Sequence, residues 1–200
     1  MRSVTPIDLA GHCPRCLLNT AICLCLDVPR VVTRTRIVIV RHVAELRLSS
    51  NTGRFAGLAL PNSCIYEYGA GEPFDQSLLR EPDTALLYHT GPVRKLEPPP
   101  RQLIVLDGTF RQARRMYKRL GALRELPELA LPPPLVPPLR LREPPHPGGM
   151  STLEAIAHAL ALLEGEDVAR PLHALQAELI RRVDALRGRR REAPTAAAAG

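Results

Sequence analysis

Tryptophan is absent from this chain, and aromatic residues of all kinds make up only 4% of its 200 residues. No apolar run approaches the ~20 residues that span a bilayer, and the N-terminus has no apolar signal core. There is also no Walker loop, no G-x-G-x-x-G motif and no internal repeat. These absences argue against a membrane protein, a P-loop enzyme and a repeat protein, and we expect a cytoplasmic chain that contacts no membrane.

Lysine is scarce as well, because the 27 basic residues include only Lys95 and Lys118 as lysines. The formal net charge of +7 attracts polyanions, of which nucleic acid is the commonest in the cytoplasm. The alternative is that part of this charge belongs only to the arginine-rich tail at Arg189–Arg191, and that genome composition explains the preference for arginine over lysine.

Runs of branched and apolar residues predict strands at 35–40, 64–68, 84–88 and 102–106. Helical periodicity predicts helices at 52–60, 109–120, 151–163 and 172–186, so strands and helices alternate as in α/β folds. Nine of the 21 prolines fall between Pro127 and Pro147, which predicts an extended connector with one short edge strand around 139–141.

Four of the five cysteines lie within thirteen residues, at Cys13, Cys16, Cys23 and Cys25. Clustered thiols in a chain without an export signal are typical of metal ligands, and four thiolates suit tetrahedral zinc in a structural role. The alternative is that reduced cysteines fill a small apolar turn. Cys64 stands alone and is expected to be a buried apolar residue.

The run 102–106 ends at Asp107, and Thr109 is placed to cap the helix that follows. Ligands of open α/β sheets bind outside the carboxyl ends of the strands, which makes Asp107 a candidate site residue. It is equally open to a role as a turn residue and helix cap. The cations Arg111, Arg114, Arg115 and Lys118 follow on the helix, either as a nucleic-acid surface or as a solvated face.

Two further helix starts are visible. Asn51 or Thr52 precedes Gly53 and Arg54, and a helix N-terminus with a nearby arginine suits a carboxylate or phosphate, although capping alone explains the pattern too. Ser151 and Glu154 have the spacing of a capping box, which needs no function to explain it.

These segments, in this order, resemble the DTW-domain family. The resemblance lies in Leu106–Phe110 with Arg111–Met116, in the four cysteines, in His42-x2-Glu45 with Asn51–Arg54, and in Ser151–Ala155. The chain departs from the family pattern in having Phe110 where tryptophan is usual and His89 in a turn that normally contains proline.

The resemblance implies a SPOUT-like α/β fold, with a zinc segment at 1–30, a catalytic domain at 31–187 and a basic, disordered tail at 188–200. It implies transfer of the 3-amino-3-carboxypropyl group from S-adenosylmethionine to N3 of a tRNA uridine, with no obligate protein partner. Asp107 would be the catalytic carboxylate, and the cations between 111 and 118 would bind tRNA. The residues expected to contact S-adenosylmethionine are Asn51, Thr52, Gly53, Arg54, His89, Thr109, Phe110, Ser151, Thr152 and Glu154. The alternatives are an S-adenosylmethionine-dependent RNA methyltransferase and a non-enzymatic, zinc-bearing RNA-binding protein.

Overall fold

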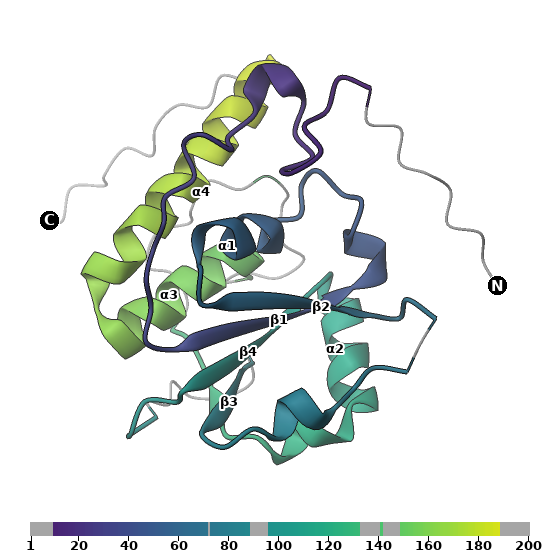
Figure 1. The fold of residues 1–200 in the computed structure, drawn as a ribbon, viewed down its shortest axis with the longest axis vertical. Helices are drawn as coiled ribbons and strands as arrows, with labels where there is room; N and C mark the ends of the chain where they lie inside the picture. Colours follow the sequence, from purple (N-terminus) through teal and green to yellow (C-terminus); the bar gives the residue numbers. More distant parts are fainter. Residues whose placement is uncertain (1–9, 72, 89–95, 133–140, 142–148, 189–200) are drawn as a thin grey trace, which may run out of the picture.

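A computed structural model describes residues 10–71, 73–88, 96–132, 141 and 149–188. Its centre is a five-stranded sheet in the order β2-β1-β4-β3-β5, in which all neighbouring strands are parallel (Figure 1). The strands are β1 Arg36–His42, β2 Ser63–Tyr68, β3 Thr84–Leu87, β4 Gln102–Asp107 and β5 Glu128–Leu129. The α/β class with a parallel sheet is confirmed, while the likeness to SPOUT folds stays a prediction.

Helices cover both faces of the sheet (Figure 1). One face carries α1 (Gly53–Ala59), α3 (Thr152–Glu164) and α4 (Glu166–Leu186), and the other carries α2 (Phe110–Arg119). The described residues also form the 3₁₀ helices η1 (Thr20–Ile22), η2 (Val43–Glu45), η3 (Ser77–Arg80) and η4 (Gly121–Glu125).

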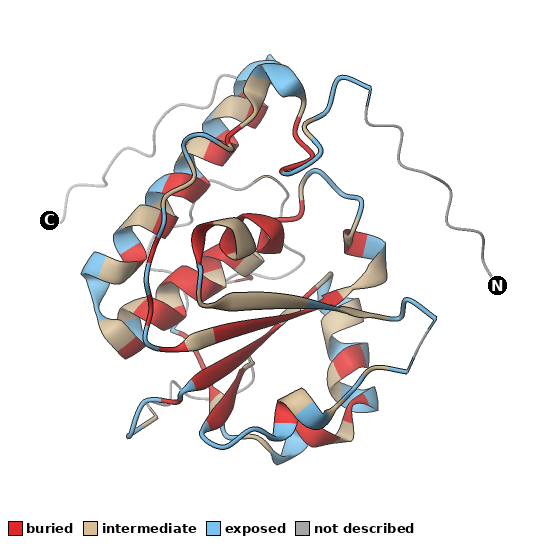
Figure 2. Cartoon of the chain, viewed as in Figure 1, coloured by how far each residue is buried: buried red, intermediate tan, exposed pale blue. Residues whose placement is uncertain are grey.

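Side chains of the central strands alternate between the two layers, as the strand period of two requires. In β1, Ile37 and Ile39 pack toward α1 and α3, whereas Val38 and Val40 pack toward α2. Figure 2 shows the buried residues concentrated in these strands and on the helix faces that meet them. Burial on both faces explains why the strands read as continuous apolar runs in the sequence.

Helices α2 and α3 both begin with a capping box. Thr109 Oγ1 accepts the Gln112 N–H at 3.3 Å, and Gln112 Oε1 accepts the Thr109 N–H at 2.7 Å. Ser151 and Glu154 make the same reciprocal pair at the start of α3. The helix starts predicted at Thr109 and Ser151 are therefore confirmed, and each satisfies two orphan N–H groups.

A short edge strand lies near the start of the proline-rich connector. Strand β5 pairs with β3, and Leu86 donates its N–H to the carbonyl of Pro127 at 2.9 Å. Proline accepts but cannot donate, so it is tolerated where an edge strand starts. Of the predicted strand at 139–141, only Leu141 lies within the described residues, and it is not in a strand.

The N-terminal segment packs on the main core. Cys16, Leu18 and Leu24 belong to the apolar cluster that joins the sheet to α1, α3 and α4. Arg182 of α4 also donates to the Cys23 carbonyl at 2.7 Å. The division of the chain at residue 30 stays a prediction, and the predicted tail lies outside the described residues beyond Gly188. Within the part of the chain that is described, no helix combines the length and apolarity that crossing a membrane requires.

Candidate functional site

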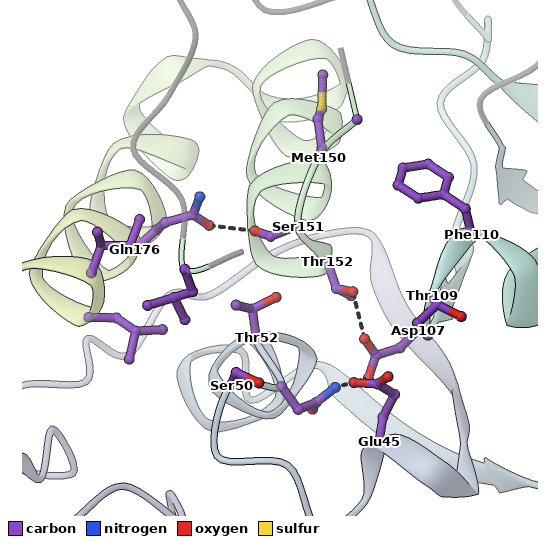
Figure 3. A pocket seen from close by; sticks show the side chains of 16 residues that line it. Glu45, Ser50, Thr52, Asp107, Thr109, Phe110, Met150, Ser151, Thr152 and Gln176 are labelled. Atoms are coloured by element: carbon purple, nitrogen blue, oxygen red, sulfur yellow. Dashed lines mark hydrogen bonds between the residues drawn. The ribbon is translucent and has the colours of Figure 1, made fainter. Parts of the chain in front are cut away.

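Three helices begin at the carboxyl edge of the sheet and enclose a cavity of about 290 Å³ (Figure 3). Helix α1 begins there after Thr52, α2 after Thr109 and α3 after Ser151, next to the end of β4. The described residues that line the cavity are Glu45, Ser50, Asn51, Thr52, Asp107, Gly108, Thr109, Phe110, Leu141, Gly149, Met150, Ser151, Thr152, Gln176, Leu179 and Ile180. The cavity therefore lies where ligands of parallel α/β sheets bind.

Asp107 is a buried carboxylate with both oxygens held. Asp107 is the last residue of β4 and is only 2% exposed. Asn51 Nδ2 donates to Oδ2 at 2.6 Å, and Thr152 Oγ1 donates to Oδ1 at 2.6 Å (Figure 3). Burial raises the pKa of Asp107, while the bonds from Thr152 and Asn51 act against that rise. A carboxylate in this setting is a stronger base than one in water.

Gly53 lets helix α1 approach this carboxylate closely. A Cβ built at Gly53 would lie 2.6 Å from Asp107 Oδ2 and 2.8 Å from its Cγ. Those distances are far below van der Waals contact, so a larger residue would push α1 or Asp107 away. The expected site residue Gly53 thus lies against Asp107 without lining the cavity itself.

Arg54 and Glu154 are near the site but serve local structure. The Arg54 guanidinium donates to the carbonyls of Leu46 and Leu48, the first of these a short bond and the second 3.0 Å long. The Arg54 N–H also donates to Asn51 Oδ1 at 3.0 Å, so this residue braces the loop that carries Asn51. Glu154 closes the α3 capping box. Neither lines the cavity, and His89 lies outside the described residues.

The sequence alone assigns no role to two polar residues of the cavity wall, Glu45 and Gln176. Glu45 belongs to the His42-x2-Glu45 motif and is 4% exposed, and its charge adds to the rise in the pKa of Asp107. Gln176 comes from α4 and reaches the cavity beside Ser151. The signal for Gln176 is a polar residue on the apolar stripe of a helix, four residues after Leu172 and three before Leu179.

A second, more apolar cavity of about 450 Å³ adjoins the first. The two share wall residues, among them Phe110, Met150 and Thr152. Tyr88 lines the second cavity, and its ring stacks on Tyr117 with centroids 4.2 Å apart. Phe110 itself is 37% exposed and lines both cavities, so part of this residue is accessible where they meet.

The α2 cations are exposed beside these cavities. Arg111, Arg114, Arg115 and Lys118 all lie in α2 with exposed side chains, and Arg114 lines the second cavity. Among the described residues, none of the four takes part in a salt bridge. Helix α2 thus presents uncompensated positive charge, as a phosphate-binding surface does.

The four cysteines converge on one point. All four Sγ atoms lie within 4.8 Å of one another, with Cys13 to Cys25 at 3.6 Å and Cys16 to Cys23 at 3.7 Å. A tetrahedral zinc with Zn–S bonds of about 2.3 Å has S···S edges of about 3.8 Å. Backbone N–H groups of Cys16 and Arg15 lower the pKa of the Cys13 thiol to about 6. The cluster has the spacing and the donor set to hold a metal ion.

These features define a class of protein: an α/β domain with a buried aspartate at the carboxyl end of a central strand and a four-cysteine cluster near the N-terminus. The family model of the DTW domain matches residues 10–184, and the chain belongs to the DTW domain family.

Named relatives are similar over most of this chain. The tRNA-uridine aminocarboxypropyltransferase 2 of Drosophila melanogaster is 31% identical over 192 residues, which cover 86% of this chain and 76% of that protein. The protein of the same name from Macaca fascicularis is 27% identical, with 86% and 64% covered. The tRNA-uridine aminocarboxypropyltransferase A of Arabidopsis thaliana is 27% identical, with 84% and 79% covered. No solved structure matches the chain significantly.

Proposed function

We propose that this chain transfers the 3-amino-3-carboxypropyl group of S-adenosylmethionine to N3 of a uridine in tRNA, in the cytoplasm and without a protein partner. The observation that carries the proposal is the buried carboxylate of Asp107 on the wall of a cavity formed by three helix starts. The relatives are named as tRNA-uridine aminocarboxypropyltransferases, which supports the same reaction.

The chemistry needs a group that manages the proton on N3. As N3 attacks the carbon next to sulfur, the N–C bond forms and the C–S bond breaks. The electron pair of the broken bond stays on sulfur, which leaves as methylthioadenosine, and the N3 proton must be accepted. We assign this role to Asp107, because burial raises its pKa while the bonds from Asn51 and Thr152 hold the ionised form.

The two adjoining cavities suit the two parts of the donor. The larger one, lined by Tyr88, Leu131 and Met150, has the apolar and aromatic walls that an adenosine ring prefers. The smaller one contains more polar side chains in its wall, among them Asn51, Thr52 and Ser151, and suits the charged amino-acid end. Asn51, Thr52, Thr109, Ser151 and Thr152 are expected to contact that end, and Phe110 lies at the junction, where a uracil ring can stack.

The exposed cations of α2 are proposed to bind the tRNA backbone. Arg111, Arg114, Arg115 and Lys118 follow directly on the cavity wall formed by Thr109 and Phe110. Phosphates held along this helix would lie next to the cavity where the uridine reacts.

The four-cysteine cluster is proposed to hold structural zinc. Its S···S distances fit tetrahedral coordination, and all four positions are taken by cysteine. With no open position implied, the metal would stabilise the N-terminal segment and take no part in the transfer.

The test is product analysis with unmodified tRNA and S-adenosylmethionine. Release of methylthioadenosine together with an aminocarboxypropyl-uridine in the digested tRNA supports the proposal. Release of adenosylhomocysteine would identify a methyltransferase instead. Binding of tRNA with neither product would leave a non-enzymatic RNA-binding protein.

A further inference from the structure

Gln176 of α4 is a buried amide with one end unused. The residue is 7% exposed, and its Oε1 accepts a hydrogen bond from Ser151 Oγ at 2.9 Å. Among the described residues nothing accepts a hydrogen bond from its Nε2, which in Figure 3 points away from Ser151. Gln176 lines the cavity, so this N–H group can donate to a bound group there, and a ligand that accepts would use a donor that the described residues leave unused.

A second donor lies at the start of α3. Thr152 is the first residue of this 13-residue helix, and its backbone N–H has no partner among the described residues. The neighbouring N–H groups of Ser151 and Glu154 are already used by the capping box. The positive end of the helix dipole adds to the preference for an anion at this corner.

The rest of the cavity wall is apolar on one side and negatively charged on another. Leu179 and Ile180, one turn further along α4 from Gln176, supply an apolar wall. Glu45 lines the same cavity, and its carboxylate makes that side favourable for a cation. Donors, apolar surface and a carboxylate in one small cavity are complementary to an α-amino acid with an aliphatic chain.

We propose that Gln176 Nε2, together with the Thr152 N–H, binds the α-carboxylate of the donor's aminocarboxypropyl group. This assignment rests on the function proposed above. Three carbons are bonded to the sulfonium, and the one that faces the nucleophile depends on how the rest of the donor is held. Anchoring the carboxylate makes Gln176 a specificity-determining residue for aminocarboxypropyl transfer as opposed to methyl transfer.

The test compares two ligands in calorimetric titrations of the whole chain. Methylthioadenosine shares the adenosine and sulfur of S-adenosylmethionine but lacks the amino-acid group. Gln176→Glu keeps the acceptor for Ser151 and puts a negative charge opposite the carboxylate, so the Kd for S-adenosylmethionine should rise about 10- to 100-fold. The Kd for methylthioadenosine should stay within about twofold. Ala174→Glu, with the same new charge on the exposed side of α4, is the matched control and should change neither Kd.

The outcomes separate the inference from the proposed function. Equal losses for both ligands, or no loss for either, would overturn the role of Gln176 and leave it as a brace between α3 and α4. If Gln176→Glu fails to fold, Gln176→Met removes the donor at similar size and must show the same ligand selectivity. A wild-type chain that yields adenosylhomocysteine would overturn the proposed function, while a selective loss in Gln176→Glu would still establish the carboxylate contact.

Discussion

The four-cysteine cluster and the Asp107 cavity both gather ionisable groups away from water, but they differ in what balances the charge. At Asp107, two neutral donors from Asn51 and Thr152 satisfy the carboxylate oxygens. In the cluster, thiols face thiols, and burial raises the pKa of Cys16 and Cys25. All four cysteines can therefore ionise together near neutral pH only with a bound cation, whereas Asp107 depends on the protein's own hydrogen bonds.

The two sites also differ in how they are assembled along the chain. The cysteines span thirteen residues, while the cavity takes residues from Glu45 to Ile180. Loss of the ion should thus act locally on the N-terminal segment, and loss of the carboxylate charge should act on chemistry without disturbing the fold. The following predictions test this contrast.

The largest effect is expected from Asp107→Asn. The amide can keep both hydrogen bonds, because the Thr152 hydroxyl can turn round and accept where it now donates. Charge and basicity are lost, so turnover with both substrates saturating should fall by roughly 10² to 10⁴. Affinity for S-adenosylmethionine should stay within a few-fold. Asp83→Asn, at an exposed position away from the cavity, is the control. Near-normal turnover would make Asp107 a structural cap, and lost donor binding would show that it shapes the donor site.

The same variant carries a pH prediction for stability. Because burial raises the pKa of Asp107, folding favours its protonated form. That contribution is complete below the ordinary aspartate pKa and is lost as pH rises through the raised value. Asp107→Asn has no such loss, so its unfolding temperature relative to the wild type should increase from about pH 4 to about pH 8. A difference that stays constant over this range would contradict the assigned shift.

Zinc removal should lower the stability of the folded chain. It should have no direct effect on the transfer reaction at Asp107. Purified protein should carry about one zinc per chain. Cys16→Ser, at a fully buried ligand position, should lower the unfolding temperature by about 5 °C or more, because about 2 kcal/mol corresponds to 4–8 °C in a chain of this size. Cys64→Ser, outside the cluster, should cost less. A fully folded protein with no metal by elemental analysis would refute the zinc assignment.

Features that depend on neighbouring residues are predictable from the sequence, as the first site illustrates. The cysteine spacing predicts a cluster, and the cap at Thr109 and the capping box at Ser151 predict helix starts that the structure confirms. Both depend on residues that are close together in the chain. The four principal strands are predicted too, and in β1, β3 and β4 burial on both faces leaves uninterrupted apolar runs.

The second site shows where such prediction ends. Asp107 is recognisable at the end of a strand, but its hydrogen bond with Thr152 joins residues 45 positions apart and follows from packing. Arg54 has partners that the sequence does not reveal, since an arginine at a helix start suggests an anion site. In the folded chain it binds carbonyls of its own loop. The edge strand β5 is too short to leave a periodic signal, so only pairing with β3 defines it.

A smaller effect is expected at the exposed cations of α2, which are proposed to bind tRNA. These residues belong neither to the cysteine cluster nor to the hydrogen bonds around Asp107. Arg111→Gln combined with Arg115→Gln removes two exposed cations of α2. If both bind phosphates, the slope of log K against log salt for tRNA should fall by about 0.7 to 0.9 for each phosphate that is no longer bound. Arg101→Gln with Arg170→Gln removes equal charge from positions paired with Asp83 and Asp167, and should change the slope less. Equal slopes for both double variants would mean that the α2 cations are only a solvent-exposed helix face and do not bind tRNA phosphates.

The smallest effect is expected where α4 contacts the N-terminal segment that carries the four cysteines. Arg182 donates to the Cys23 carbonyl and pairs with Asp27, each at 2.7 Å, and also binds Glu178. Arg182→Met should lower the unfolding temperature by about 2–4 °C, for a loss of about 1 kcal/mol, and should leave S-adenosylmethionine affinity unchanged. Zinc should be lost faster to a chelator, since the segment that carries Cys23 is less firmly held.

Arg181→Met is the matched control for this last prediction, because Arg181 binds the same Glu178 without reaching the N-terminal segment. The hydrogen bonds from Arg181 and Arg182 lower the pKa of Glu178 to about 2. Their ion-pair contribution is thus present above the ordinary glutamate pKa and is lost as pH falls toward about 2. The bond from Arg182 to the Cys23 carbonyl does not titrate. At acid pH the drop in unfolding temperature caused by Arg181→Met should therefore shrink toward zero, while Arg182→Met should still lower the unfolding temperature. Equal drops for the two variants at acid pH would mean that the bond to the Cys23 carbonyl adds no stability.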